Sequence, residues 1–131
     1  MWPFRNRSAD GDSGRRGERL AEKHLRAAGY KILARNYRCP VGEVDLIALK
    51  AEGNARTIVF VEVKTRRSDA HVDPESAVDA DKRRRMLKVA RYYLSRRDAD
   101  DCDARFDVIA VVIPPDGPPT VRHIVAAFGP E

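Results

Sequence analysis

The chain of 131 residues contains only two cysteines, Cys39 and Cys102, which stand far apart and form no Cys-x-x-Cys motif. Such sparse cysteines predict reduced thiols in a cytoplasmic protein, because they do not form a disulfide framework. The three histidines, His24, His71 and His123, are scattered without ligand spacing. A structural zinc site, which takes about four Cys, His or carboxylate ligands, is therefore not expected.

Long apolar runs are also missing. No stretch approaches the roughly 20 apolar residues of a membrane-spanning helix. The N-terminal segment MWPFRNRSAD lacks the apolar core of a signal peptide, and the sequence contains no internal repeat. We therefore expect no membrane partner.

The chain does contain enough apolar sequence for one core, and an excess of positive charge. Apolar residues make up 43% of it, which at this length predicts a single domain. The formal net charge is +5 at pH 7 and the pI is about 9.5. This charge favours a polyanionic partner such as nucleic acid, but an ordinary basic surface is equally compatible with it.

The first predicted element is a helix over residues 17–30. It follows a polar segment, residues 1–14, which we predict to be a flexible tail ahead of a single domain at 15–128. Gly29 stands where a helix commonly ends with a glycine cap. The stripe that would face the core consists of Leu20, Ala21, Leu25 and Ala28.

Three strand-like segments come next, at residues 31–37, 43–50 and 57–65, and the last is the most hydrophobic. The segment AEGNA at 51–55 predicts a hairpin turn between the second and third strands. Residues 67–78 are polar and predict a loop.

The second half of the chain begins with a predicted helix over residues 81–97, followed by a buried strand over 105–113. The proline-rich segment 114–119 must turn, and 120–128 predicts an edge strand or a short helix. The order, α-β-β-β-α-β plus a final short element, is typical of an α/β domain with a mixed β-sheet flanked by helices. Asp107, in the buried strand, is expected to be structural.

The second predicted helix is crowded with cations. Its apolar stripe consists of Met86, Leu87, Ala90 and Leu94, with Tyr93 beside it, and both Tyr92 and Tyr93 are expected to pack rather than stack on bases. Most of the cations must then face solvent, where they could contact phosphates or form an ordinary solvated surface. They are Lys82, Arg83, Arg84, Arg85, Lys88, Arg91, Arg96 and Arg97.

The strand VFVEVKTR, residues 59–66, carries two charges inside its apolar run. Because side chains alternate along a strand, Glu62 and Lys64 lie on one face, about 7 Å apart at the backbone. If Lys50 lies opposite Thr57 in the hairpin, Asp45 falls opposite Glu62, with Cβ atoms about 5 Å apart. Facing carboxylates in apolar surroundings need compensation from Lys64, from a raised pKa or from a bound cation.

A third acid, Glu18, lies on the apolar stripe of the first helix and so points toward the sheet. Each charge also has an ordinary explanation. Glu62 and Lys64 could be an exposed ion pair, Asp45 a solvated hairpin residue, and Glu18 a partner of the helix dipole. The convergence of three acids and a lysine on one place favours a functional site.

Asp45 followed by Glu62-Val63-Lys64 resembles the D…(D/E)xK core of the PD-(D/E)XK nucleases, and Glu18 resembles the extra acid of their Holliday-junction-resolvase branch. Over residues 15–128 the chain resembles the YraN family. That resemblance is carried by GERLAEKHLRAAGYKILARNYRCPVGEVDLIA, VFVEVKTR, AVDADKRRRMLKVARYYL and RFDVIAV. It implies a restriction-endonuclease-like fold and kinship to nucleases.

The resemblance also implies roles for individual residues. Asp45, Glu62 and the Val63 carbonyl would hold Mg²⁺ or Mn²⁺, Lys64 would orient water or stabilise charge, and Glu18 would assist. Lys82 matches a lysine at the start of the family's second helix. Arg83 stands where such proteins often carry glutamine, which leaves that polar role in doubt.

Two hypotheses follow, and a third explains less. The first is a metal-dependent nuclease that hydrolyses phosphodiester bonds in structured or branched DNA, acting as a possible homodimer because two symmetric cuts need two sites. The second is a nucleic-acid-binding module of the same fold with little or no catalysis. The third, a purely structural interaction protein, leaves the three acids without an explanation. The sequence does not decide between DNA and RNA.

Overall fold

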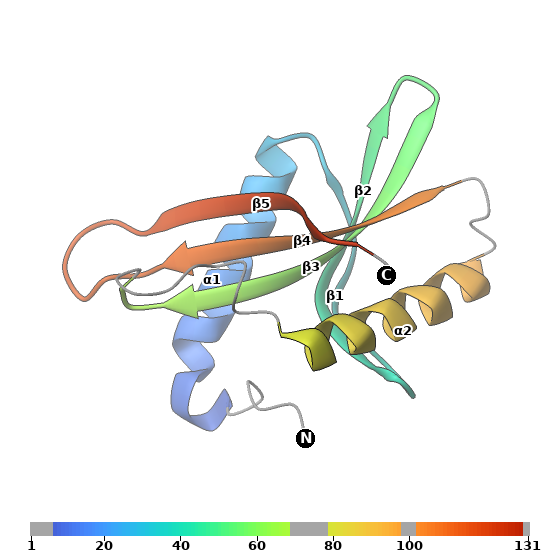
Figure 1. The fold of residues 1–131 in the computed structure, drawn as a ribbon. Coiled ribbons are helices and arrows are strands. Elements are labelled where there is room, and N and C mark those ends of the chain that lie inside the picture. Colours follow the sequence, from blue (N-terminus) through green and yellow to red (C-terminus); the bar gives the residue numbers. More distant parts are fainter. Residues whose placement is uncertain (1–6, 69–78, 98–101, 130–131) are drawn as a thin grey trace.

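The computed structural model describes residues 7–68, 79–97 and 102–129, which contain two helices and five strands (Figure 1). The elements, in chain order, are α1 (Arg7–Ala27), β1 (Lys31–Cys39), β2 (Gly42–Glu52), β3 (Ala55–Arg66), α2 (Ala80–Arg97), β4 (Asp103–Val112) and β5 (Thr120–Phe128). The predicted α/β architecture with a mixed sheet is therefore confirmed. The final element is a strand and not a short helix.

The five strands form one sheet in the order β1-β2-β3-β4-β5. Neighbours pair antiparallel except β3 and β4, which are parallel and are joined through the segment that contains α2. A parallel pair needs such a long crossover, whereas β2 and β3 need only a tight hairpin. Gly53, with φ of 60°, forms that turn within the predicted segment 51–55.

The central strand β3 is buried on both faces, which accounts for its nearly continuous apolar run. Its alternate residues serve different cores. Val59, Val61 and Val63 pack on the α1 side, and Ile58 and Phe60 pack on the α2 side. The two helices thus cover opposite faces of the sheet, with α1 behind it and α2 in front in Figure 1.

Helix α1 ends as the sequence predicts. Gly29 has φ of 91°, and the N–H of Tyr30 donates to the carbonyl of Leu25 over 2.9 Å, which is the bond of a Schellman cap. The helix begins at Arg7, ten residues before the predicted start, and so includes part of the segment assigned to a tail. Residues 1–6 lie outside the described residues, and the domain boundary at 15 stays a prediction.

Helix α1 lies close against the sheet at Gly17. A side-chain carbon at this position would clash with the hydroxyl of Thr65 in β3. Ala21 and Leu25, one and two turns later, are fully buried on the same side, whereas Leu20 is only half-buried and Ala28 is exposed. The small residue at this close contact sets Glu18, its neighbour, beside the sheet.

Helix α2 buries a stripe that differs from the predicted one. Met86 and Ala90 are buried as expected, and Val89 and Tyr93 are buried with them, whereas Leu87 and Leu94 are only half-buried. Lys82 belongs to the same stripe, because positions 82, 86, 89 and 93 recur at helical spacing. Helix α2 therefore directs one lysine into the interior.

Two other expectations concern the periphery. The loop predicted at 67–78 falls mostly on residues 69–78, which lie outside the described residues. Across the described residues, neither helix has the length and hydrophobicity to cross a membrane.

Candidate functional site on β2 and β3

The hairpin register is the one that the sequence predicts. Lys50 pairs with Thr57, and the ladder runs to the pair of Leu46 and Val61. Asp45 and Glu62 follow directly on that last pair. At this point the Asp45 side chain joins the strands, because its Oδ2 accepts the Val63 N–H over 2.8 Å. The two acids are therefore on adjacent antiparallel strands.

Both acids are taken out of water: Asp45 is 4% exposed and Glu62 is 1% exposed. Burial raises the pKa of Asp45 well above 3.8, and the negative charges of Glu62 and Glu18 add to that rise. The Val63 N–H bond opposes it. The charges of Glu18 in α1 and Glu62 in β3 thus both act on Asp45 in β2.

Two lysines meet the acids. The Lys82 ammonium donates to Glu62 Oε2, and Lys64 Nζ lies 3.8 Å from the same oxygen. The pKa of Lys64 is lowered to about 8, first by burial and then by the charge of Lys82, whereas Glu62 and Asp45 oppose the shift. Glu62 Oε1 is buried and accepts no hydrogen bond from any residue that the structure describes.

The explanation of Glu62 and Lys64 as an exposed pair is wrong, since Glu62 is buried, and so is the explanation of Asp45 as a solvated residue. Lys82 also needs correction. We predicted it on the solvent face of α2, but it is 7% exposed and belongs to the acid cluster. The sequence signal was its position one turn before Met86 on the buried stripe.

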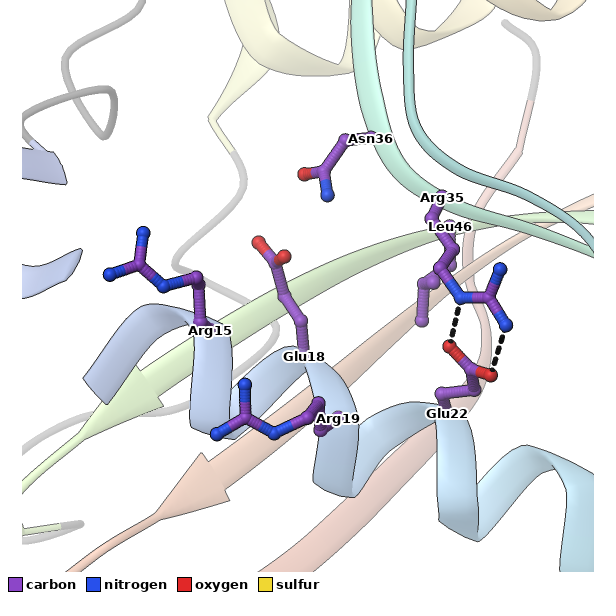
Figure 2. Close-up of a pocket in the computed structure, with 7 residues that line it drawn as sticks. All are labelled: Arg15, Glu18, Arg19, Glu22, Arg35, Asn36 and Leu46. Carbon is purple, nitrogen blue, oxygen red and sulfur yellow. Dashed lines mark hydrogen bonds and ion pairs between the residues drawn. The ribbon is translucent and has the colours of Figure 1, made fainter. Parts of the chain in front are cut away.

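Asp45, Glu62, Lys64 and Lys82 form an acid cluster with Glu18 at its edge. Glu18 also lies in a pocket between α1 and the strands β1 and β2. The pocket has a volume of about 320 Å³. Figure 2 shows its lining, which consists of Arg15, Glu18, Arg19, Glu22, Arg35, Asn36 and Leu46. Leu46 follows Asp45 directly in β2 and the charge of Glu18 acts on Asp45, so the pocket lies near the buried acids.

The remaining cations of α2 lie where the sequence predicts. Arg84, Arg85, Lys88 and Arg91 are exposed, and Arg83 is half-buried, with its guanidinium 5.4 Å from the centre of the Phe128 ring. Arg84 pairs with Asp81 on the helix surface. Arg96 and Arg97 lie over the rings of Tyr92 and Tyr93, respectively.

A metal ion would have few protein ligands here. Within residues 7–68, 79–97 and 102–129, no three Asp, Glu, His or Cys side chains are grouped so as to hold one. Two buried carboxylates and a main-chain carbonyl remain, and they suit a hard cation such as Mg²⁺, which usually keeps several waters. Glu62 Oε1, which has no hydrogen-bond partner among the described residues, is consistent with such an oxygen donor set.

Comparison with known proteins gives the relationship. Residues 17–111 match the family described as "Uncharacterised protein family UPF0102". The chain belongs to the UPF0102 family. This confirms the resemblance to YraN, and the matched segment contains the candidate residues Glu18, Asp45, Glu62, Lys64 and Lys82.

Relatives in the UPF0102 family are similar along most of their length. The UPF0102 protein of Syntrophus aciditrophicus is 48% identical over 105 residues, which is 80% of each chain. The one from Pelobacter propionicus is 46% identical over 117 residues, 89% of this chain and 82% of the relative. The one from Nocardia farcinica is 44% identical over 115 residues, which is 88% of this chain and 87% of the relative.

A second polar cluster lies around Asp107, which is fully buried in β4. Arg105 donates two hydrogen bonds to its carboxylate over 2.9 and 2.8 Å, and the Ala126 N–H donates a third over 2.9 Å. His123 Nε2 lies 2.7 Å from Asp107 Oδ2, and His123 Nδ1 lies 3.1 Å from His24 Nε2. Sequence reasoning set both histidines aside, because no spacing links residues that are 99 positions apart.

Proposed function

We propose that this UPF0102 protein is a metal-dependent nuclease that hydrolyses phosphodiester bonds, with structured or branched DNA as its substrate. The observation that carries the proposal is the buried pair of Asp45 and Glu62, which is costly for folding. Burial and mutual repulsion raise the pKa of Asp45, and one oxygen of Glu62 has no described partner. Such unfavourable electrostatics are typical of functional sites.

Asp45, Glu62 and the Val63 carbonyl would hold Mg²⁺ or Mn²⁺. When bound, the ion would polarise the phosphate and lower the pKa of a coordinated water. The charge of the ion would also relieve the repulsion between the two carboxylates.

The lysines and Glu18 have separate tasks in this proposal. Lys64 is half-buried and 3.8 Å from Glu62, so its ammonium could bind a non-bridging phosphate oxygen as negative charge develops there. Lys82 pairs with Glu62 and orients its carboxylate from the α2 side. Glu18, at the mouth of the cluster, would position a water or a second cation.

The exposed cations of α2 would bind the backbone of the substrate. They include Arg84, Arg85, Lys88 and Arg91, and the same helix supplies Lys82 to the acid cluster. Arg84, Lys88 and Arg91 lie on the helix face opposite Lys82, so the substrate backbone would cross α2 outside the acid cluster. Contacts to phosphates do not depend on the base sequence of the DNA, and they suit a protein that recognises the shape and branching of its substrate.

The alternative function is a nucleic-acid-binding module without catalysis. The basic face of α2 supports both functions equally. The buried acids favour the nuclease, because a binding module gains nothing from two carboxylates that repel each other next to a phosphate site.

The decisive test is a cleavage screen on branched, flapped, single-stranded and duplex DNA and on RNA, with Mg²⁺ or Mn²⁺. The wild type should cut at least one branched substrate, and Glu62→Gln and Lys64→Ala should lose at least about a hundredfold in rate. Glu52→Gln, an exposed change at the far end of β2, is the matched control and should retain full activity. Binding without cleavage by the wild type would favour the module.

Metal binding can be measured without activity. In melting curves across a magnesium titration, the wild type should be stabilised by mass action, and Glu62→Gln and Asp45→Asn should not. Equal shifts in all three proteins would mean that the ion binds elsewhere. Sedimentation of the protein with and without a branched substrate would test the proposed homodimer.

A further inference from the structure

The pocket beside Glu18 has a charge distribution that the three acids do not explain. Three guanidinium groups and two carboxylates line it, which leaves one net positive charge. This positive surface lies near the buried carboxylates of Asp45 and Glu62. A divalent cation would bind to the acids and not to the arginines, so the pocket calls for a different ligand.

One carboxylate of the pocket is already paired. Glu22 accepts from Arg35 through both oxygens, over 2.6 and 2.7 Å, and from Arg26 over 3.0 Å. The Arg35 hydrogen bond, opposed in part by burial, lowers the pKa of Glu22 to about 2. Figure 2 shows this pair at one end of the pocket. The charge of Glu22 is therefore compensated within the protein.

The other end of the pocket holds Arg15 and Arg19, one turn apart on α1 and both exposed. They extend from the helix beside Glu18, and Asn36 lies across the pocket from that carboxylate (Figure 2). Asn36 has φ of 49°, a left-handed conformation that asparagine tolerates better than most residues. Two guanidinium groups and an amide N–H₂ are donors that suit a phosphate.

We infer that this pocket binds one phosphate of the substrate strand, adjacent in that strand to the phosphate at which cleavage occurs. The inference rests on the proposed function and extends its substrate contacts. Leu46 links the two places, because it lines the pocket beside Glu18 and follows Asp45 directly in β2. The strand would thus be held on both sides of the acids, by α2 on one side and by Arg15 and Arg19 of α1 on the other.

Binding in EDTA tests the pocket independently of hydrolysis. The probes are a short fluorescent single-stranded oligonucleotide and the same sequence as a duplex, each titrated across a salt series. Arg15→Ala/Arg19→Ala should weaken single-strand binding about tenfold, roughly the value of one charge-assisted hydrogen bond. It should also lower the log–log salt slope by about 0.7, the loss of one phosphate contact. Arg15→Gln/Arg19→Gln should behave in the same way.

The matched control is Arg16→Ala/Lys23→Ala, which removes the same charge from exposed positions of the same helix outside the pocket. The control should keep the wild-type salt slope. Equal losses in the two double variants would overturn the inference, because a general charge effect would explain both. Melting temperatures equal to that of the wild type would show that each variant folds.

A titration with inorganic phosphate at matched ionic strength tests whether the ligand of the pocket is a nucleic-acid strand or free phosphate. If it raises the melting temperature through Arg15 and Arg19 while oligonucleotide binding does not need them, the pocket binds free phosphate and the inference is wrong. If the arginines are needed for binding but the wild type cuts nothing, the pocket stands and the nuclease proposal fails. If the wild type cleaves DNA and Arg15→Ala/Arg19→Ala binds like the control variant, the inference about the pocket is wrong and the nuclease proposal is unaffected.

Discussion

Asp45 and Asp107 are both buried aspartates in strands of the same sheet, yet their surroundings differ. Asp107 accepts two hydrogen bonds from Arg105 and one from the Ala126 N–H, and it contacts His123. Asp45 accepts the Val63 N–H and faces two further carboxylates. Burial would raise the pKa of both. At Asp107 the contacts of His123 and Arg105 outweigh burial and lower the pKa, whereas at Asp45 the pKa stays raised.

The difference separates a structural acid from a candidate functional one. Around Asp107 the protein itself supplies the opposite charge of Arg105 and further hydrogen-bond partners, and the cluster joins β4 to β5 and, through His24, to α1. Around Asp45 and Glu62 the lysines compensate incompletely, and one carboxylate oxygen has no partner in the described part of the chain. A buried charge that is compensated only in part suits a ligand.

The largest expected effect is on the Asp107 cluster. Asp107→Ala should lower the free energy of unfolding by about 4 kcal/mol, because it leaves Arg105 and the Ala126 N–H without their acceptor. Urea unfolding measures the change. Asp103→Ala, an exposed acid in the same strand, is the control and should change little. A loss below about 1 kcal/mol would contradict a structural role.

The next effect concerns the lysine that enters the acid cluster. Lys82→Ala should cost about 2 kcal/mol without metal, less than a fully broken buried pair, because Lys64 is close enough to Glu62 to compensate in part. Adding Glu62→Gln should recover much of that loss. Additive losses in this double-mutant cycle would show that the two side chains do not interact.

A smaller effect of opposite sign is expected at Asp45. Its folded-state pKa is raised, so the stability that this carboxyl contributes is present below pH 3.8 and is lost as pH rises through the raised pKa. Asp45→Asn removes that loss and should be more stable than the wild type by up to about 1 kcal/mol at neutral pH without metal. The gap should close toward pH 4. A variant less stable than the wild type at neutral pH would make Asp45 structural.

The smallest expected effect is the contribution of His24 to the pH dependence of the free energy of unfolding. Burial, followed by the neighbouring His123, lowers the pKa of His24 below 6.5. The stability tied to neutral His24 is therefore present above pH 6.5 and is lost as pH falls through 6.5 toward the lowered pKa. His24→Gln, which can keep the bond to His123, should flatten this part of the stability profile. Lys23→Gln on the exposed side of α1 should leave it unchanged.

The sequence was sufficient for the elements and for the acid pair. Strand alternation placed Glu62 and Lys64, and the hairpin turn at Gly53 set the register that brings Asp45 beside Glu62. Both are short-range effects, because a tight turn leaves two strands few ways to pair. The Gly29 cap of α1 was predicted for the same reason.

The tertiary structure alone decided which cations meet the acids and which groups surround Asp107. Lys82 contacts Glu62 because α2 packs its buried stripe, which includes Met86 and Val89, against the sheet face that carries Phe60. His24 reaches His123 only because α1 packs on a face where β5 lies at the edge. The sequence by itself determined the periodic faces and the local turns. It could not determine these pairings, because they depend on how helices far away in the chain dock on the sheet.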